Sequence, residues 1–149
     1  DNAATIAVAN EALKSGLNPE RKRAALYYRA KALLATNDGK AAEKDLAELA
    51  KDTRTTEGAE AKYLLAQLMF DQERNSECEK EIMEYIDEST PHAYWLARSF
   101  VLLADLYASQ GRNAEAKQYL VSLQSNYSAD DDIKTLIEER LNNLSTENQ

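Results

Sequence analysis

One stretch of the sequence occurs again after 38 residues, and this internal repeat restricts the possible folds more than any other feature. Residues 66–78 and 104–116 carry the same residue at six of thirteen aligned positions. A third, more divergent copy covers residues 30–42, which begin 36 residues earlier. A period of about 20–50 residues is typical of proteins built from stacked copies of one supersecondary unit. The sequence therefore predicts an array of such units.

Each copy begins and ends with a small residue, and the two are always twelve residues apart. The pairs are Ala30 and Ala42, Ala66 and Cys78, and Ala104 and Ala116. Two helices can cross closely only where both carry small residues at the contact. The fixed spacing therefore predicts a helical hairpin in each copy.

The whole sequence has helical periodicity and few residues that interrupt helices. It contains four Gly and two Pro, which is too few for a fold of many short strands joined by turns. The spacing of apolar residues predicts eight helices. We place them at residues 2–15, 19–36, 39–52, 56–72, 75–88, 91–110, 113–127 and 130–145.

Particular residues are expected to set the helix ends. Asn18-Pro19 and Thr55 have the properties of helix N-caps and first-turn residues. Gly39 is expected to supply a positive φ in the turn at residues 37–39. Asp130–Asp132 should complement the positive end of the last helix.

The third copy places apolar, small and aromatic residues in a recognisable order, at Phe100, Leu103, Ala104, Tyr107, Ala116 and Leu120. The second copy keeps much of this order, at Leu65, Ala66, Met69, Cys78 and Ile82. The first is the most divergent, with Leu26, Arg29, Ala30, Leu33, Ala42 and Leu46. These residues resemble the tetratricopeptide repeat, although the closing Pro of that family is absent from all three copies.

The resemblance implies an all-α, right-handed superhelical solenoid of antiparallel helix hairpins. It divides the chain into an orphan helix of an upstream repeat, three repeats, and a C-terminal capping helix with a tail, at residues 1–18, 19–54, 55–90, 91–128 and 129–149. Because the first helix lacks a hairpin partner, we expect further repeats of the same parent chain before it. The apolar side of that helix, at Ile6, Val8 and Leu13, should then be incompletely covered.

Residues 94–127 are also similar to the last repeats of long tetratricopeptide proteins from Bacteroidota cell envelopes, of the type of the outer-membrane assembly lipoprotein BamD. This second resemblance implies a bacterial periplasmic or cell-envelope location. No apolar run approaches the roughly 18 residues of a membrane span, so we expect no direct membrane insertion.

The charge distribution argues against a nucleic-acid partner. Residues 1–74 carry twelve basic and twelve acidic side chains, whereas residues 75–149 carry six and fourteen, so the net charge of −8 lies in the second half. A nucleic-acid surface needs excess positive charge to displace counterions from phosphates.

The side chains needed for catalysis or for metal and cofactor binding are scarce. The single Cys excludes an internal disulfide, and Cys78 matches Ala42 and Ala116, which predicts a small buried residue. A nucleophilic Cys needs a nearby base, and the only His, His92, is fourteen residues away. A run of acidic residues is expected to form a solvated face of one helix, at Glu77, Glu81, Glu84 and Glu88. We therefore expect a non-catalytic protein without a metal or cofactor.

The expected function is binding of a protein or peptide on a concave face formed by the first helix of each hairpin. Residues at i, i+4 and i+7 share one face of a helix. The candidate contact residues are Tyr27, Lys31, Leu34, Tyr63, Gln67, Phe70, Val101 and Asp105. Contact should centre on Tyr27, Tyr63 and Phe70. Two alternatives remain open: these aromatics are ordinary core between repeats, or the chain is a structural spacer or capping segment without a ligand.

Two further aromatic residues, Tyr94 and Trp95, open the third repeat. We expect them to pack over Tyr85 and Ile86 of the preceding helix. The alternative is an aromatic anchor for a partner.

Overall fold

The computed structural model describes residues 1–147, and this part of the chain contains eight α-helices and no strand. The helices match the eight expected ones, with ends that differ by up to three residues. They are α1 (Asn2–Leu13), α2 (Pro19–Ala35), α3 (Gly39–Leu49), α4 (Thr56–Asp71), α5 (Asn75–Asp87), α6 (Ala93–Ser109), α7 (Asn113–Asn126) and α8 (Ile133–Glu147).

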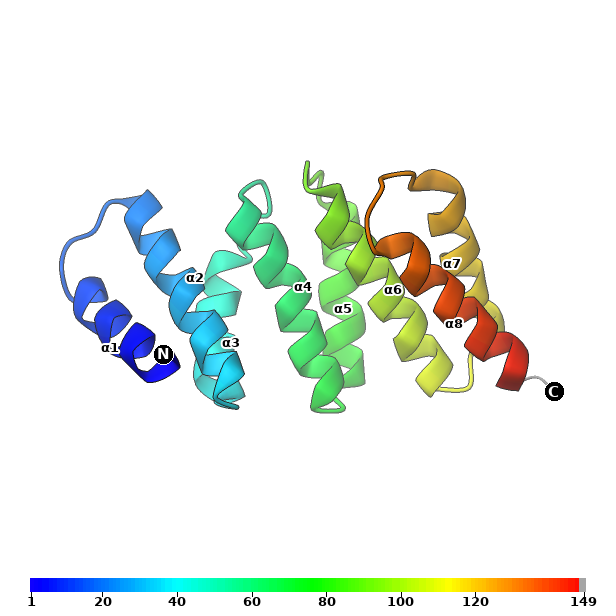
Figure 1. The fold of residues 1–149 in the computed structure, drawn as a ribbon, viewed down its shortest axis with the longest axis horizontal. Coiled ribbons are helices and arrows are strands. Elements are labelled where there is room, and N and C mark those ends of the chain that lie inside the picture. Colours follow the sequence, from blue (N-terminus) through cyan, green and yellow to red (C-terminus); the bar gives the residue numbers. More distant parts are fainter. Residues whose placement is uncertain (148–149) are drawn as a thin grey trace.

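The helices follow one another from one end of the molecule to the other, with the two termini at opposite ends (Figure 1). We call α2, α4, α6 and α8 the front layer and α3, α5 and α7, which lie behind them in this view, the rear layer. Each helix packs against its neighbours in the chain. The front-layer helices also pack against one another, in the pairs α2–α4, α4–α6 and α6–α8, whereas no two rear-layer helices are in contact.

The turn inside each hairpin has the same conformation in all three copies. The residues with positive φ are Asn37, Glu73 and Gly111, at 60°, 57° and 75°. Each is followed by a residue whose N–H donates across the turn, as Asp38 does to the carbonyl oxygen of Leu33 at 2.8 Å. This bond closes the end of a helix whose next residue is left-handed. The structure therefore confirms that the repeat found in the sequence is a repeat of conformation.

One prediction about these turns is wrong. Asn37 has the positive φ that we had assigned to Gly39, which instead begins α3. A β-carbon on Gly39 would lie 2.9 Å from Leu68 Cδ1 of α4. This glycine therefore allows α3 and α4 to approach closely.

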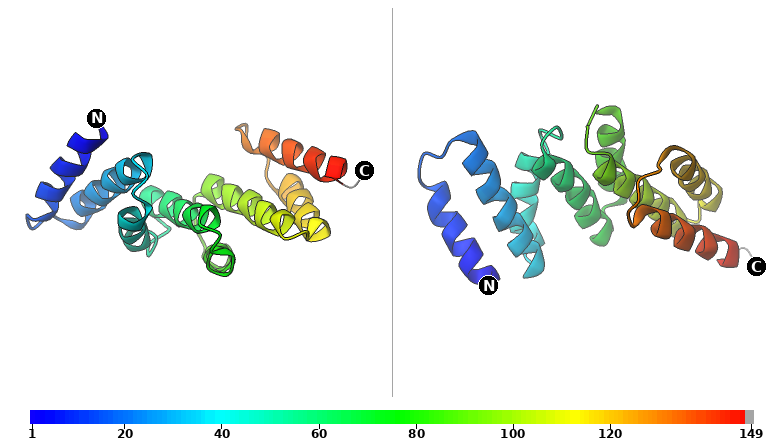
Figure 2. Two further views of the ribbon diagram at one scale, coloured as in Figure 1. Left: turned by 90° about the horizontal axis from the view of Figure 1, so that it is seen from below. Right: turned by 45° about the horizontal axis from the view of Figure 1, so that its top comes forward.

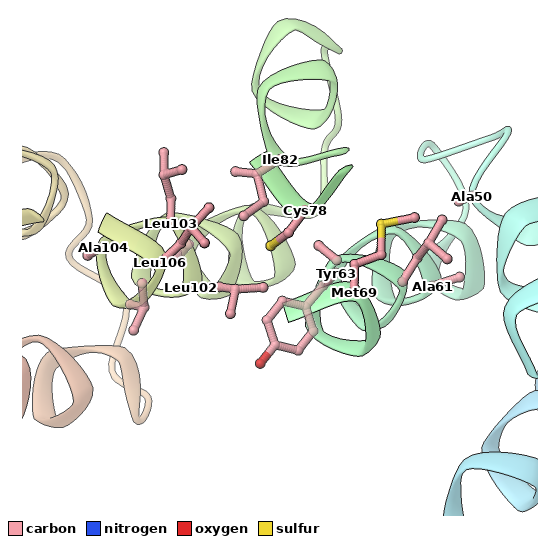
Figure 3. Packing of buried hydrophobic residues seen from close by; sticks show 14 of the residues in the cluster. Ala50, Ala61, Tyr63, Met69, Cys78, Ile82, Leu102, Leu103, Ala104 and Leu106 are labelled. Atoms are coloured by element: carbon pink, nitrogen blue, oxygen red, sulfur yellow. The ribbon is translucent and has the colours of Figure 1, made fainter. Parts of the chain in front are cut away.

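The small residues of the repeat lie in the core, as their spacing predicted. Six are buried between helices, namely Ala30, Ala42, Ala66, Cys78, Ala104 and Ala116. Figure 3 shows Cys78 and Ile82 of α5 pointing toward α4 and α6. The buried apolar residues form one continuous cluster from α2 to α8.

The predicted N-caps of α2 and α4 are confirmed. Asn18 Oδ1 accepts the N–H of Arg21 at 2.8 Å, and Thr55 Oγ1 accepts the N–H of Gly58 at 2.9 Å. The last helix differs from its prediction because it begins at Ile133, after the three aspartates, with Asp131 Oδ1 accepting its first N–H at 3.0 Å.

The tail also differs from its prediction within the described residues. Helix α8 continues to Glu147, so Ser145 and Thr146 belong to the helix. Residues 148–149, which the prediction assigned to the same tail, lie outside the described part of the chain.

The exposure predicted for the first helix is correct for only one residue. Val8 is 70% exposed, but Ile6 and Leu13 are half-buried and pack against the core. The reason is that α2 already covers part of the apolar side of α1.

Candidate binding face

All eight candidate contact residues lie on the front layer, but their exposure differs. Tyr63 of α4 and Val101 of α6 are buried, with only 6% of Tyr63 exposed. The others are half-buried, namely Tyr27, Lys31, Leu34, Gln67, Phe70 and Asp105. The sequence spacing thus identified one layer correctly, while the degree of burial depends on the neighbouring helices.

Two candidates on α2 meet the same carboxylate of α4. The Tyr27 hydroxyl donates to Glu60 Oε1 at 2.9 Å, and Lys31 Nζ lies 2.6 Å from Glu60 Oε2. Glu60 is buried, and burial together with this carboxylate raises the pKa of Tyr27 to about 12. The two contacts hold α2 and α4 together at the front of the molecule.

Arg98 of α6 makes the corresponding contact to α4. Its Nη2 donates to the Tyr63 hydroxyl at 3.1 Å, and its guanidinium lies over the Tyr63 ring, 5.1 Å from the ring centroid. Its Nη1 contacts the Tyr94 hydroxyl at 3.1 Å and Asp132 at 3.4 Å. The Tyr63 hydroxyl donates in turn to Gln67 Oε1 at 3.1 Å.

These two bridges use equivalent positions of the repeat. Tyr63 follows Tyr27 by 36 residues, and Arg98 follows Glu60 by 38 residues, which are the two offsets between copies. A tyrosine therefore meets a charged side chain of the next front-layer helix twice, with an acidic partner first and a basic one second. Our sequence analysis missed Glu60 and Arg98, although their separation by one repeat offset was a signal that could have paired them.

A third bridge joins α6 to α8. Arg140 Nε donates to Asp105 Oδ1 at 2.9 Å beside a small cavity of about 190 Å³ between α6, α7 and α8. Burial raises the pKa of Asp105, and the Arg140 guanidinium partly opposes that shift. Each neighbouring pair of front-layer helices is thus joined by a polar contact.

The aromatic pair that opens α6 lies elsewhere than we expected. The Trp95 ring packs against Tyr63 of α4, with centroids 5.6 Å apart, and against Tyr94 at 4.9 Å. Tyr94 is half-buried beside Arg98. This places both aromatic residues around the central bridge of the front layer.

Arg29, the residue that departs from the family pattern, has a partner inside its own hairpin. Its Nη2 and Nε donate to the two carboxylate oxygens of Asp45 at 2.6 and 2.8 Å. Asp45 is buried in α3. A bidentate pair of this kind links α2 to α3 where the family pattern has an apolar contact.

The acidic run on α5 does not form a uniformly solvated face, so this prediction is wrong in part. Glu81 and Glu84 pair with the buried Lys62 of α4, at 2.7 and 3.1 Å. Glu88 accepts a hydrogen bond from the Thr53 hydroxyl at 2.5 Å. These carboxylates join α5 to α4 and to the α3–α4 loop, and they are not arranged around a cleft.

Within residues 1–147 no three His, Cys, Asp or Glu side chains gather closely enough to hold a metal ion. None of the described helices is long and apolar enough to cross a membrane. His92 Nε2 lies 2.8 Å from the Arg54 carbonyl oxygen. The arrangement of the front layer can therefore be discussed as a surface for contact with another molecule.

Comparison with known proteins yields no match: no family model, no curated protein and no solved structure corresponds to this chain.

The thiol of Cys78 is expected to be unreactive in the folded protein. Burial raises its pKa from an ordinary value of 9.0 to about 12, so little thiolate forms at pH 8, and thiolate is the reactive species. Because the shift is upward, its contribution to stability is present below about pH 9 and is lost as the pH rises toward 12. Titration with a disulfide reagent at pH 8 should label Cys78 only after denaturant is added. Rapid stoichiometric labelling of the native protein would contradict this.

Proposed function

We propose that this chain is a non-catalytic scaffold of three tetratricopeptide-like hairpins that binds a peptide or a partner helix on its front layer. The observation that carries the proposal is the recurrence of one hairpin geometry with one interhelical bridge. The same left-handed turn residue follows α2, α4 and α6, and a tyrosine meets a charged residue of the next front-layer helix in two consecutive units. Such recurrence is expected of a solenoid.

The curvature required for a binding groove is supported by the unequal packing of the two layers. Front-layer helices touch one another, whereas rear-layer helices touch only front-layer helices. A row that is packed more closely on one side bends toward that side. Seen from below, the end helices α1 and α8 lie on the side of the row opposite α3 and α5 (Figure 2, left). The front layer is then the concave side.

The chemistry of the front layer suits an extended or helical peptide with apolar anchors. Tyr27, Leu34 and Phe70 are half-buried, so part of each apolar side chain is available for contact. Lys31 and Gln67 stand beside them and can donate hydrogen bonds to backbone carbonyl oxygens. Aromatic anchors surrounded by polar groups are typical of the energetically important part of a protein interface. The proposal includes no catalytic step, and it favours a protein of the bacterial cell envelope.

A second candidate function is a structural spacer or capping segment, and one observation favours it. Lys31, Arg98 and Arg140 each meet a carboxylate or phenol of a neighbouring front-layer helix. Charged groups satisfied inside the molecule contribute less to recognition of a partner. In a spacer, these bridges would serve only to hold the helices at a fixed spacing.

Site-specific photo-crosslinking in producing cells separates the two functions. A benzophenone amino acid is placed at Leu34 or Phe70 of the front layer and, as a matched control, at the exposed Val121 of α7. A binding scaffold should yield one discrete crosslinked protein from both front-layer positions and none from Val121. Absence of a front-specific product, with every variant folded by circular dichroism, would favour the spacer.

A further inference from the structure

An apolar surface remains uncovered at the end of the molecule that contains α1. We define this N-terminal face by the residues that line a shallow hollow of about 500 Å³ between α1 and α2, namely Ala4, Thr5, Val8, Ala12, Ala25 and Tyr28. Val8 and Tyr28 are 70% and 61% exposed. The third exposed large apolar residue, Val121, lies far away in the chain on α7. The N-terminal face thus gathers two of the three such residues found in the described chain.

The internal repeat shows what happens to the same positions in the other hairpins. The equivalents of Tyr28 are Leu64 and Leu102, and those of Ala25 are Ala61 and Ser99, at the offsets of 36 and 38 residues. Leu64 is half-buried and packs against the core, while the other three are buried. Figure 3 shows Ala61 on the side of α4 that faces Ala50 at the end of α3, and Leu102 near Tyr63 of α4.

The element that covers these equivalent positions is in each case a preceding front-layer helix. Helix α2 packs on α3 and α4, α4 packs on α5 and α6, and α6 packs on α7 and α8. The pair α1 and α2 has no such helix among the described residues. The N-terminal face therefore has the composition and position of a helix-packing surface.

The opposite end of the molecule has a different character. The outer side of α8 carries exposed polar residues, namely Lys134, Thr135, Glu138, Glu139, Asn142 and Asn143. A second copy that placed its α8 on the N-terminal face would bury these polar groups against alanine and valine, which is unfavourable. The charge pattern thus argues against head-to-tail association of this chain.

We propose that the N-terminal face binds an amphipathic α-helix of a partner protein, which packs on α1 and α2 as α2 packs on α3 and α4. Ala4, Ala12 and Ala25 allow the partner's backbone to approach closely. Val8 and Tyr28 contact apolar residues that the partner helix carries at i, i+3 or i+4, and i+7. This surface is distinct from the front-layer groove, so the two can be occupied independently.

The probe for this proposal is a synthetic peptide of residues 18–38, because α2 is the helix that covers the equivalent surface of α3 and α4. Binding of the labelled peptide to the intact chain is measured by fluorescence anisotropy. We expect saturable binding that Val8→Asp and Tyr28→Asp each weaken at least tenfold. The control Val121→Asp, which places the same charge at an exposed apolar residue of α7, should leave the affinity unchanged.

Two other results would overturn the proposal. One is the absence of saturable binding up to the solubility limit of the peptide, or binding that Val8→Asp does not weaken while circular dichroism shows the variant to be folded. The other is a dimer of the free chain in sedimentation equilibrium that Val8→Asp dissociates, because a second copy would then be the occupant. None of these results bears on the front-layer groove, which the crosslinking experiment tests separately.

Discussion

Replacing Gly58 with alanine should destabilise the fold by about 3 kcal/mol, at the upper end of the usual cost of overpacking. Gly58 is buried in the first turn of α4. A β-carbon at this position would lie 1.9 Å from the Asp52 carbonyl oxygen and 2.7 Å from that of Leu49. Both atoms are backbone, so α4 would have to move away from the end of α3, and the packing of the two helices would be lost with it.

Gly16→Ala is the matched control. Gly16 is exposed, and an added β-carbon there meets no atom within 4 Å. It should therefore be neutral or stabilise by about 0.4–1 kcal/mol, because alanine restricts the unfolded chain. Urea denaturation followed by circular dichroism measures both free energies of unfolding. Equal midpoints for the two variants would show that the close approach of α3 and α4 does not exist in solution.

Tyr63→Ala should cost about 3–5 kcal/mol, the usual loss for truncating a buried aromatic residue. Only 6% of Tyr63 is exposed, and its ring packs against Trp95 and beneath the Arg98 guanidinium. Truncation would leave a cavity between α4 and α6 and would also remove the hydroxyl contacts with Arg98 and Gln67.

Tyr28→Ala provides the comparison, because Tyr28 is 61% exposed and surface substitutions usually change stability by no more than about 0.5 kcal/mol. The two free energies of unfolding are obtained from urea titrations of purified variants. A small loss for Tyr63→Ala would mean that the tyrosine is available to a partner, as the groove interpretation of the sequence requires. A large loss would assign it to the core between α4 and α6.

Much of the architecture was predictable because it depends on local and periodic features. The fixed spacing of small residues, such as Ala66 and Cys78, predicted hairpins, and these residues are buried. Asn18 and Thr55 predicted helix starts because capping depends on atoms only a few residues away. The start of α8 was misplaced because three consecutive aspartates offer several possible caps, and only one of them, Asp131, accepts the first N–H.

The candidate face was predicted less completely. Helical spacing placed the candidate residues on one side of α2, α4 and α6, but it did not reveal their bridging partners. The contacts Tyr27–Glu60 and Arg98–Tyr63 join residues 33 and 35 positions apart. Such pairs depend on how one helix is placed against the next, and propensity and spacing within a single helix do not specify that placement.

The sequence by itself determined the helical class, the number of helices and the repeat, because hydrogen bonding within helices, capping and apolar periodicity act over short distances along the chain. Only the tertiary structure decided which of two similar tyrosines is buried. Tyr28 and Tyr63 both lie in front-layer helices, yet Tyr63 is covered by Trp95 and Arg98 of α6 while no described helix covers Tyr28. Burial is a property of what packs on a residue from elsewhere in the chain, and it becomes fixed only when the helices are placed together.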